Sequence, residues 1–203
     1  MKNTLLAVFV ATLLLSAGSA MAAATVGKPA PEFSLADLDG KPVKLADFKG
    51  KVVVLEWWNP ECPFVKAAHG RGSLVGLAKR HTDKGVVWLA INSGAPGKQG
   101  AGADKSREGA KAFGMSHPVL LDSDGTVGKA YGATNTPHLF VIGKDGALQY
   151  RGAIDNSPDG EGASPQGGKL VNHVAQAIDA LAAGAAVPVR ETKAYGCSVK
   201  YAN

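Results

Sequence analysis

Short runs of apolar residues, separated by turns rich in glycine and proline, recur along the chain. The longest beyond the first 22 residues covers residues 52–58, in which only Glu56 interrupts the apolar character, and it predicts a fully buried strand. Further runs predict strands over 86–91 and 119–121. Two pairs of runs flank Gly-containing turns and predict hairpins, at 33–35 with 43–45 and at 139–142 with 148–151.

Apolar residues recur near a period of 3.6 in the remaining segments, which predicts helices over 63–80, 106–113, 126–131 and 170–181. Gly70 and Gly72 weaken the middle of the first of these. Strands that alternate with helices predict an α/β fold with right-handed crossovers. We expect a central mixed β-sheet flanked by helices on both faces, with an N-terminal β-hairpin extension.

The first 22 residues predict a secretory signal peptide rather than part of the fold. Lys2 supplies a positive start, residues 5–15 are apolar, and Ala20 and Ala22 provide a small-residue cleavage signal. We therefore expect a periplasmic or secreted protein with no stable membrane insertion after cleavage. A single domain over 23–186 and a tail over 187–203 should make up the mature chain.

The formal charge of +5 comes from 22 basic and 17 acidic residues. The basic residues are scattered, without a cluster or interleaved aromatic residues. This pattern favours a solvated surface and argues against a nucleic-acid partner.

Cys62 follows the long buried strand and precedes a predicted helix, with Pro60 and Pro63 marking the turn. A thiol at a helix N-terminus faces free backbone N–H groups and the positive end of the helix dipole. Both favour the thiolate, which is the reactive form. Lys66 and His69 lie on the same helical face, where they either stabilise that thiolate or are solvated surface charges.

Glu56 shares a strand face with Trp58, because alternate residues of a strand point the same way. If it is buried, its pKa should be raised, and the carboxyl could exchange a proton during thiol chemistry. The alternative is an edge position with the carboxylate in water.

Cys197 is the second of only two cysteines and lies in the tail, next to Gly196. Three interpretations stay open for an exported protein: a mobile tail that brings a resolving thiol to Cys62, a permanent structural bridge, or two unpaired thiols. A structural bridge would block Cys62, which favours the redox interpretation.

Three segments resemble the thioredoxin-like redoxin superfamily, near the branch that contains thiol-disulfide oxidoreductases and alkyl hydroperoxide reductase-like, thiol-specific antioxidant proteins. They are residues 56–66 around Cys62, residues 136–142, and Asp145-Gly146 with residues 150–152. The resemblance implies a thioredoxin-like fold and a nucleophilic Cys62. It also implies a cis Pro137 that shapes the substrate groove and a Thr136 backbone that pairs with an extended substrate.

The same resemblance places Trp58 and Pro63 with Thr136 as substrate contacts, and it places Glu56 at the position of the family's buried acid. The chain departs from the family at two positions. Val65 stands where the second cysteine of a Cys-x-x-Cys motif is expected, and Asn59 stands where peroxiredoxins have a hydroxyl residue.

We therefore expect an exported thiol-dependent oxidoreductase that uses Cys62 for thiol-disulfide exchange and Cys197 as the resolving thiol. Its partners would be protein thiols or disulfides and a thiol reductant, without a cofactor or a resident metal. One alternative is a peroxiredoxin-like peroxidase that consumes small hydroperoxides. Another is a non-catalytic module that binds a partner or metal and has a structural Cys62–Cys197 bridge. A copper site would draw on His117 and His138 as well, since thiolate and imidazole suit that metal.

Overall fold

The structure is a computed structural model that describes residues 23–202 of the 203-residue chain. The predicted signal peptide lies outside the described residues. The strands are β1 (Ser34–Asp37), β2 (Pro42–Lys44), β3 (Val53–Trp57), β4 (Val87–Asn92), β5 (Val119–Leu121), β6 (Asn135–Thr136), β7 (His138–Ile142), β8 (Leu148–Gly152) and β9 (Cys197–Ser198). The helices are the 3-10 helix η1 (Leu45–Phe48) and the α-helices α1 (Pro63–Gly70), α2 (Leu77–Thr82), α3 (Ala103–Ala112), α4 (Thr126–Tyr131) and α5 (His173–Ala182). Within residues 23–202, no helix has the length and apolar character needed to cross a membrane.

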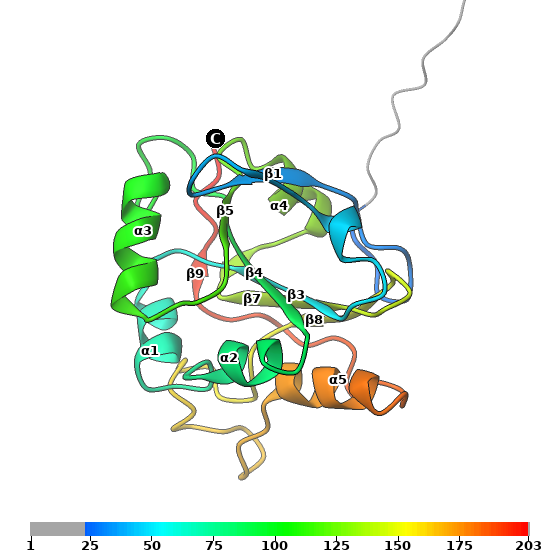
Figure 1. Ribbon diagram of the computed structural model, residues 1–203. Coiled ribbons are helices and arrows are strands. Elements are labelled where there is room, and N and C mark those ends of the chain that lie inside the picture. Colours follow the sequence, from blue (N-terminus) through cyan, green and yellow to red (C-terminus); the bar gives the residue numbers. More distant parts are fainter. Residues whose placement is uncertain (1–22, 203) are drawn as a thin grey trace, which may run out of the picture.

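Seven strands form one mixed sheet in the order β2-β1-β5-β4-β3-β7-β8 (Figure 1). β3 lies inside it, parallel to β4 and antiparallel to β7, and all five of its residues are buried. The β1–β2 hairpin extends the sheet at one edge through antiparallel pairing with β5. The predicted α/β class, the mixed sheet and the N-terminal hairpin are confirmed.

The two faces of the sheet carry separate cores because successive side chains of a strand point in opposite directions. On one face, Leu55, Trp57 and Phe140 pack with Tyr131 of α4. On the other face, β-strand residues such as Val54 pack against α1, α2 and α5, which lie below the sheet in Figure 1. The sheet is therefore buried on both sides around β3, the strand that leads to Cys62.

The predicted helix over 63–80 is wrong as a single element. The chain forms α1 and α2 with a turn between them, and α2 begins after Gly76, whose φ of 64° is left-handed. Gly72 lies so close to the Gly160 backbone that a β-carbon there would meet the Gly160 carbonyl. Leu74 nevertheless stays buried in the core. The break between α1 and α2 therefore does not expose this apolar side chain.

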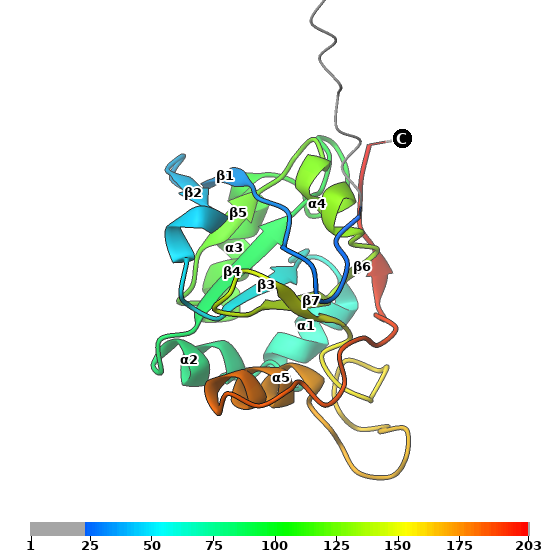
Figure 2. The ribbon, with the colours of Figure 1, turned by 90° about the vertical axis from the view of Figure 1, so that its right-hand side faces the viewer.

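The tail from residue 187 packs on the domain instead of extending away from it. Its first part lies beside β8, where the Thr192 N–H donates to the Arg151 carbonyl at 3.1 Å. Its last part forms β9 and continues past it, with the Val199 N–H donating to the Thr134 carbonyl at 3.0 Å. Figure 2 shows β9, in red, beside β6 at the edge of the molecule. The tail that carries Cys197 is therefore docked on the domain as a short strand.

Candidate redox site

Cys62 lies at the junction between β3 and α1, as the sequence pattern predicts. It is the N-cap residue of α1, with an extended backbone at φ −71° and ψ 125°, and Pro63 occupies the first helical position. Proline is well suited to that position because the helix needs no N–H donor there. The Cys62 side chain is 0% exposed, although Pro63 beside it is exposed.

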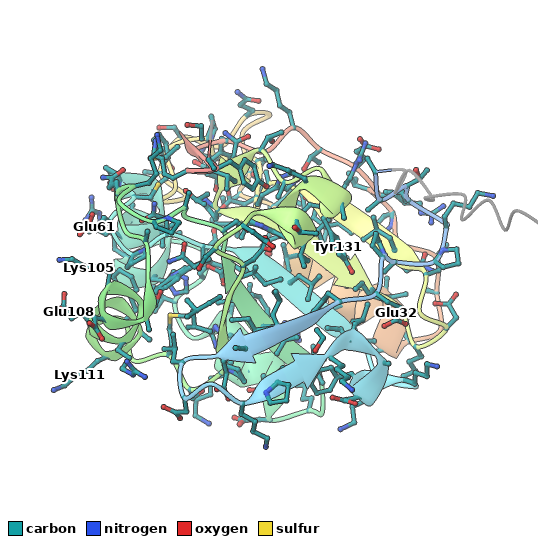
Figure 3. The ribbon with its side chains drawn as sticks, turned by 90° about the horizontal axis from the view of Figure 1, so that it is seen from above. Glu32, Glu61, Lys105, Glu108, Lys111 and Tyr131 are labelled. Carbon is teal, nitrogen blue, oxygen red and sulfur yellow. The ribbon has the colours of Figure 1, made fainter. Side chains whose placement is uncertain are left out.

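The turn before Cys62 is fixed by side-chain hydrogen bonds. The Asn59 amide accepts from the Glu61 N–H at 2.9 Å and donates to the Gln99 carbonyl at 3.0 Å. The Glu61 carboxylate accepts from the Gly100 N–H at 2.9 Å and lies 3.4 Å from Lys105 of α3 (Figure 3). Asn59 therefore braces the turn, and its amide is engaged in the protein's own hydrogen bonds.

The residues predicted to form the substrate groove lie directly against Cys62. The Thr136–Pro137 peptide bond is cis, as expected from the resemblance. The Cys62 thiol donates to the Thr136 carbonyl at 3.1 Å. The Thr136 hydroxyl is buried and has no partner in the part of the chain that the structure describes. The fold thus brings Cys62, Thr136 and Pro137 together.

The second cysteine reaches the same place from the far end of the chain. β9 pairs antiparallel with β6, and in this register Cys197 is opposite Thr136. The sulfur atoms of Cys62 and Cys197 lie 2.7 Å apart, and both cysteines are free. The fold therefore places the two sulfur atoms close enough to react with each other.

The two thiols differ in acidity. Burial raises the pKa of Cys62, but hydrogen bonds from the side chain of Cys197 and from the backbone of Val65 outweigh burial and lower it below its usual value. Burial and the hydrogen bond and charge of Cys62 together raise the pKa of Cys197 to about 11. Cys62 is therefore the more acidic thiol of the pair and the one that forms the thiolate first.

Glu56 is fully buried on the face of β3 that it shares with Trp58, so the edge-position alternative is wrong. Its carboxylate lies 2.7 Å from His69 Nε2 and accepts from the Trp88 indole N–H at 3.0 Å. Burial raises the pKa of Glu56, but His69, His117 and the Trp88 hydrogen bond outweigh it, and the net shift is downward. The expectation that the pKa of Glu56 would be raised is wrong. The contact between Glu56 and His69 depends on how α1 packs over β3, which the sequence pattern does not show.

His69 matches neither of its two predicted alternatives, because it lies beside Glu56 instead of in solvent or against Cys62. The His69 ring contacts Glu56 and stacks on Phe113, with ring centroids 5.3 Å apart. Lys66 is exposed on α1, as the solvated alternative expected.

Trp58 also differs from its predicted place as a substrate contact. It is only 1% exposed and packs beneath α3, where Phe113 meets it edge-on at 6.4 Å between ring centroids. A ring at this depth has no surface for a substrate, because α3 covers the position.

Val65 fills the position that the second cysteine of a Cys-x-x-Cys motif would take. It is fully buried and packs in one cluster with Trp58, Cys62 and Ala90. Position 65 therefore contributes to the hydrophobic core, and the thiol that faces Cys62 comes from β9 instead.

The histidines of the copper alternative lie in other surroundings. Burial, followed by the charge of Arg151, lowers the pKa of His138 to about 4, and its ring packs on Phe140 at 4.5 Å between centroids. His117 lies near Trp88, with ring centroids 6.0 Å apart. Across residues 23–202, no three His, Cys, Asp or Glu side chains are grouped so that they could hold a metal ion.

Two tyrosines, one on each side of Cys197, hold the tail on the domain and were not predicted from the sequence. The Tyr195 hydroxyl donates to Asp155 at 3.0 Å, and the Tyr201 hydroxyl donates to the Ala133 carbonyl at 2.8 Å. Tyr195, Cys197, Val199 and Tyr201 alternate with other residues, which is the period of a strand. That period is the signal that could have revealed a docked tail.

A helix N-terminal thiol that faces a cis-proline loop, at the end of a central strand of a mixed sheet, defines a thioredoxin-like protein. Solved structures agree with this class. A hypothetical protein from Sinorhizobium meliloti 1021 matches with a TM-score of 0.76 and 28% identity over 89% of this chain and 97% of its own. An uncharacterized conserved protein from Geobacillus kaustophilus matches with a TM-score of 0.75 and 33% identity over 88% and 93%.

Residues 25–165 match the family model Redoxin, and the chain belongs to that family. Among curated relatives, it is 33% identical over 128 residues to the thiol-disulfide oxidoreductase ResA of Bacillus thuringiensis subsp. konkukian. That match covers 61% of this chain and 66% of the relative, just under two thirds of its length. The ResA of Geobacillus thermodenitrificans is 32% identical, with 63% and 68% covered.

Proposed function

We propose that this chain is a thiol-disulfide oxidoreductase whose redox pair is Cys62 and Cys197. The observation that carries the proposal is the 2.7 Å contact between the two sulfur atoms at the cis-proline loop. The similarity to ResA, whose name describes the same reaction type, supports it. The low pKa of Cys62 makes this residue the nucleophile.

In the proposed cycle, the Cys62 thiolate attacks one sulfur of a substrate disulfide, and the other substrate sulfur leaves as a thiolate that takes up a proton. Cys197 then loses its proton and attacks the Cys62 sulfur of the mixed disulfide. The second substrate sulfur leaves, and the Cys62–Cys197 disulfide forms. The substrate gains two electrons and two protons, and the dithiol loses them.

Regeneration of the dithiol would begin at Cys197. Cys62 is fully covered, whereas Cys197 is only half-buried, so an external thiolate reaches the Cys197 sulfur first. Cys62 then leaves as the thiolate, and its lower pKa makes it the better leaving group. A second thiol attacks the resulting mixed disulfide, which frees Cys197 and oxidises the two external thiols to a disulfide.

Glu56 enters the proposal as a positioning residue. Its lowered pKa keeps it ionised at neutral pH, which makes it a weaker proton acceptor than the sequence suggested. Its contact with His69 joins β3 to α1, the helix whose N-terminus holds Cys62.

A peroxiredoxin-like reaction ranks below disulfide exchange because the Asn59 amide is already engaged with Glu61 and Gln99. No hydroxyl residue replaces it at that position, so a peroxide would lack the orienting group that the family uses.

The test is turnover of a model peptide disulfide with dithiothreitol as the electron donor. We expect Cys62→Ser to lose activity by about 100-fold or more, because the nucleophile is gone. Cys197→Ser should be attacked once and then accumulate a mixed disulfide at Cys62, while Ser198→Ala, an exposed neighbour, should behave as wild type. Full turnover by Cys197→Ser, or free thiols that persist after oxidation of the wild type, would contradict the proposed pair. Faster consumption of hydroperoxide than of disulfide would assign the chain to the peroxidases instead.

We further propose that the protein is exported and acts on thiols and disulfides of other proteins outside the cytoplasm. The charged start, apolar run and small-residue motif within residues 1–22 support export. The mass of the protein recovered from the periplasm or medium should correspond to cleavage close to Ala22, and retention of the leader in the cytoplasm would contradict export.

A further inference from the structure

The last part of the tail presents every second side chain to the domain. Tyr195, Cys197, Val199 and Tyr201 contact it, whereas Ser198 between them is exposed. This alternation is the geometry of an added strand, whose main chain supplies pairing and whose alternate side chains supply specificity.

Each of the inward side chains meets a defined site on the domain. The Tyr195 ring lies 6.3 Å from the ring of Phe64, in α1, while its hydroxyl reaches Asp155. Val199 packs against the core cluster of the sheet. The Tyr201 ring covers Gly125 and Gly128, at both of which a β-carbon would collide with it. These sites form a row along β6.

Within the tail, Gly196 makes an especially close approach to the backbone of the domain. Its φ of 105° lies in a region that residues with a β-carbon rarely adopt. A β-carbon at this position would meet the Thr136 carbonyl oxygen and would lie 3.3 Å from Pro137 Cδ. The Asn135 amide also donates to the Gly196 carbonyl at 3.0 Å. The groove therefore requires glycine directly before the cysteine that faces Cys62.

We propose that the groove along β6 is a peptide-binding site that selects an extended segment with an aromatic residue, glycine and cysteine in succession, followed two residues later by an apolar side chain. The chain's own tail, Tyr195-Gly196-Cys197-Ser198-Val199, occupies it as such a segment. The inference rests on the proposed function and names its substrate class: disulfides whose cysteine lies in this context in an extended, accessible polypeptide.

The tail can leave the groove without losing its attachment to the domain. The Thr192 hydroxyl lies 2.7 Å from the Tyr150 hydroxyl and accepts from the Ala153 N–H at 2.9 Å, which fixes the start of the segment. Lys193 and Ala194 make no hydrogen bond within the described part of the chain, so they form the hinge. A substrate segment would then pair with β6, and Cys62 would attack its cysteine sulfur and expel the thiolate bonded to that sulfur.

The test uses the full chain with Cys197→Ala and synthetic peptides that correspond to residues 193–203. The peptide cysteine is activated as a mixed disulfide with thionitropyridine, so attack by Cys62 joins it to the peptide and releases the coloured aromatic thiolate. Compared with the parent peptide, we expect Gly196→Ala and Tyr195→Ala peptides to react at least about tenfold more slowly. The Ser198→Ala peptide is the matched control and should react like the parent, because Ser198 points away from the domain.

Equal rates for all peptides, with normal reaction of Cys62 towards the small disulfide 4,4′-dithiodipyridine, would overturn the selective groove and leave the oxidoreductase proposal standing. Failure of Cys62 to react with dithiodipyridine as well would overturn both. The ratio of the reaction rates of the parent and Gly196→Ala peptides therefore tests the groove independently of the proposed oxidoreductase function.

Discussion

Because the two thiols of the redox site are hydrogen-bonded to each other, they should lose their protons at well-separated pH values. We predict that thiolate absorbance at 240 nm rises in two steps. The first step belongs to Cys62, whose pKa is lowered from its usual value, and the second lies near pH 11 and belongs to Cys197.

Cys197→Ala separates the causes of this behaviour. It removes the side-chain donor with the largest effect on Cys62, so the remaining step should move to higher pH. The hydrogen bond from the Val65 backbone should keep part of the downward shift of the Cys62 pKa. Two coincident steps near pH 8.5 in the wild type would contradict the hydrogen-bonded dithiol.

The buried Glu56 carboxylate should stabilise the fold in a pH-dependent way. Its pKa in the folded protein is depressed, so its contribution is fully present above the unfolded value of about 4.3 and is lost as pH falls through the lower folded value. We predict that Glu56→Gln lowers the free energy of unfolding at pH 7 by about 1–3 kcal/mol. The difference from wild type should shrink below about pH 4. Urea unfolding at both pH values measures it.

Glu161→Gln is the matched control, since Glu161 forms an exposed ion pair with Arg71. Its urea midpoint should stay close to that of the wild type. A Glu56→Gln difference that grows on acidification would reverse the sign and show that the carboxyl is protonated in the folded state.

At the scale of elements, local pattern predicted most of the fold. The run at 52–58 became β3, and residues 119–121 and 126–131 became β5 and α4 with the predicted bounds. The break after α1 escaped prediction because it depends on Gly72 meeting the distant Gly160 backbone. β9 escaped because two residues are too short a signal without the strand they pair with.

Two glycines at the end of α1 allow that break to be tested. A β-carbon at position 72 would collide with the Gly160 backbone, whereas one at position 70 would meet nothing within 4 Å. We predict that Gly72→Ala lowers the free energy of unfolding by about 1–3 kcal/mol, as overpacking does. Gly70→Ala should change it by less than about 1 kcal/mol in either direction. Similar urea midpoints for the two variants would contradict this prediction. They would show that the 155–168 loop moves to accommodate the β-carbon at position 72 without a loss of stability.

At the scale of the whole molecule, the site divides into a half that sequence predicts and a half that it does not. Cys62, Thr136 and Pro137 could be assigned because each lies in a local motif of the family. The pairing of Glu56 with His69 depends on how α1 packs over β3. The position of Cys197 depends on a tail that crosses the domain to β6, a contact over 135 residues of sequence that no local pattern encodes.

The docked tail should control how often Cys62 is exposed. Tyr201 anchors its end through the Ala133 hydrogen bond and through ring contact with Gly125 and Gly128. Removal of both contacts by Tyr201→Ala should favour the undocked state by about 1.4 kcal/mol or more, which corresponds to a tenfold larger open population. We predict a matching increase in the rate at which a bulky maleimide labels Cys62 under reducing conditions, followed by peptide mass spectrometry.

Tyr201→Phe separates the two contacts, because it keeps the ring over the glycines and removes only the hydroxyl. A hydrogen bond contributes about 1 kcal/mol, so this variant should label about fivefold faster than the wild type, less than Tyr201→Ala. When the tail closes faster than the reagent reacts, the labelling rate follows the open population, and the order wild type, Tyr201→Phe, Tyr201→Ala should hold. Equal labelling of Cys62 in all three proteins would contradict the role of Tyr201 as the anchor. It would place the barrier to substrate access nearer the hinge, between the fixed Thr192 and Tyr195.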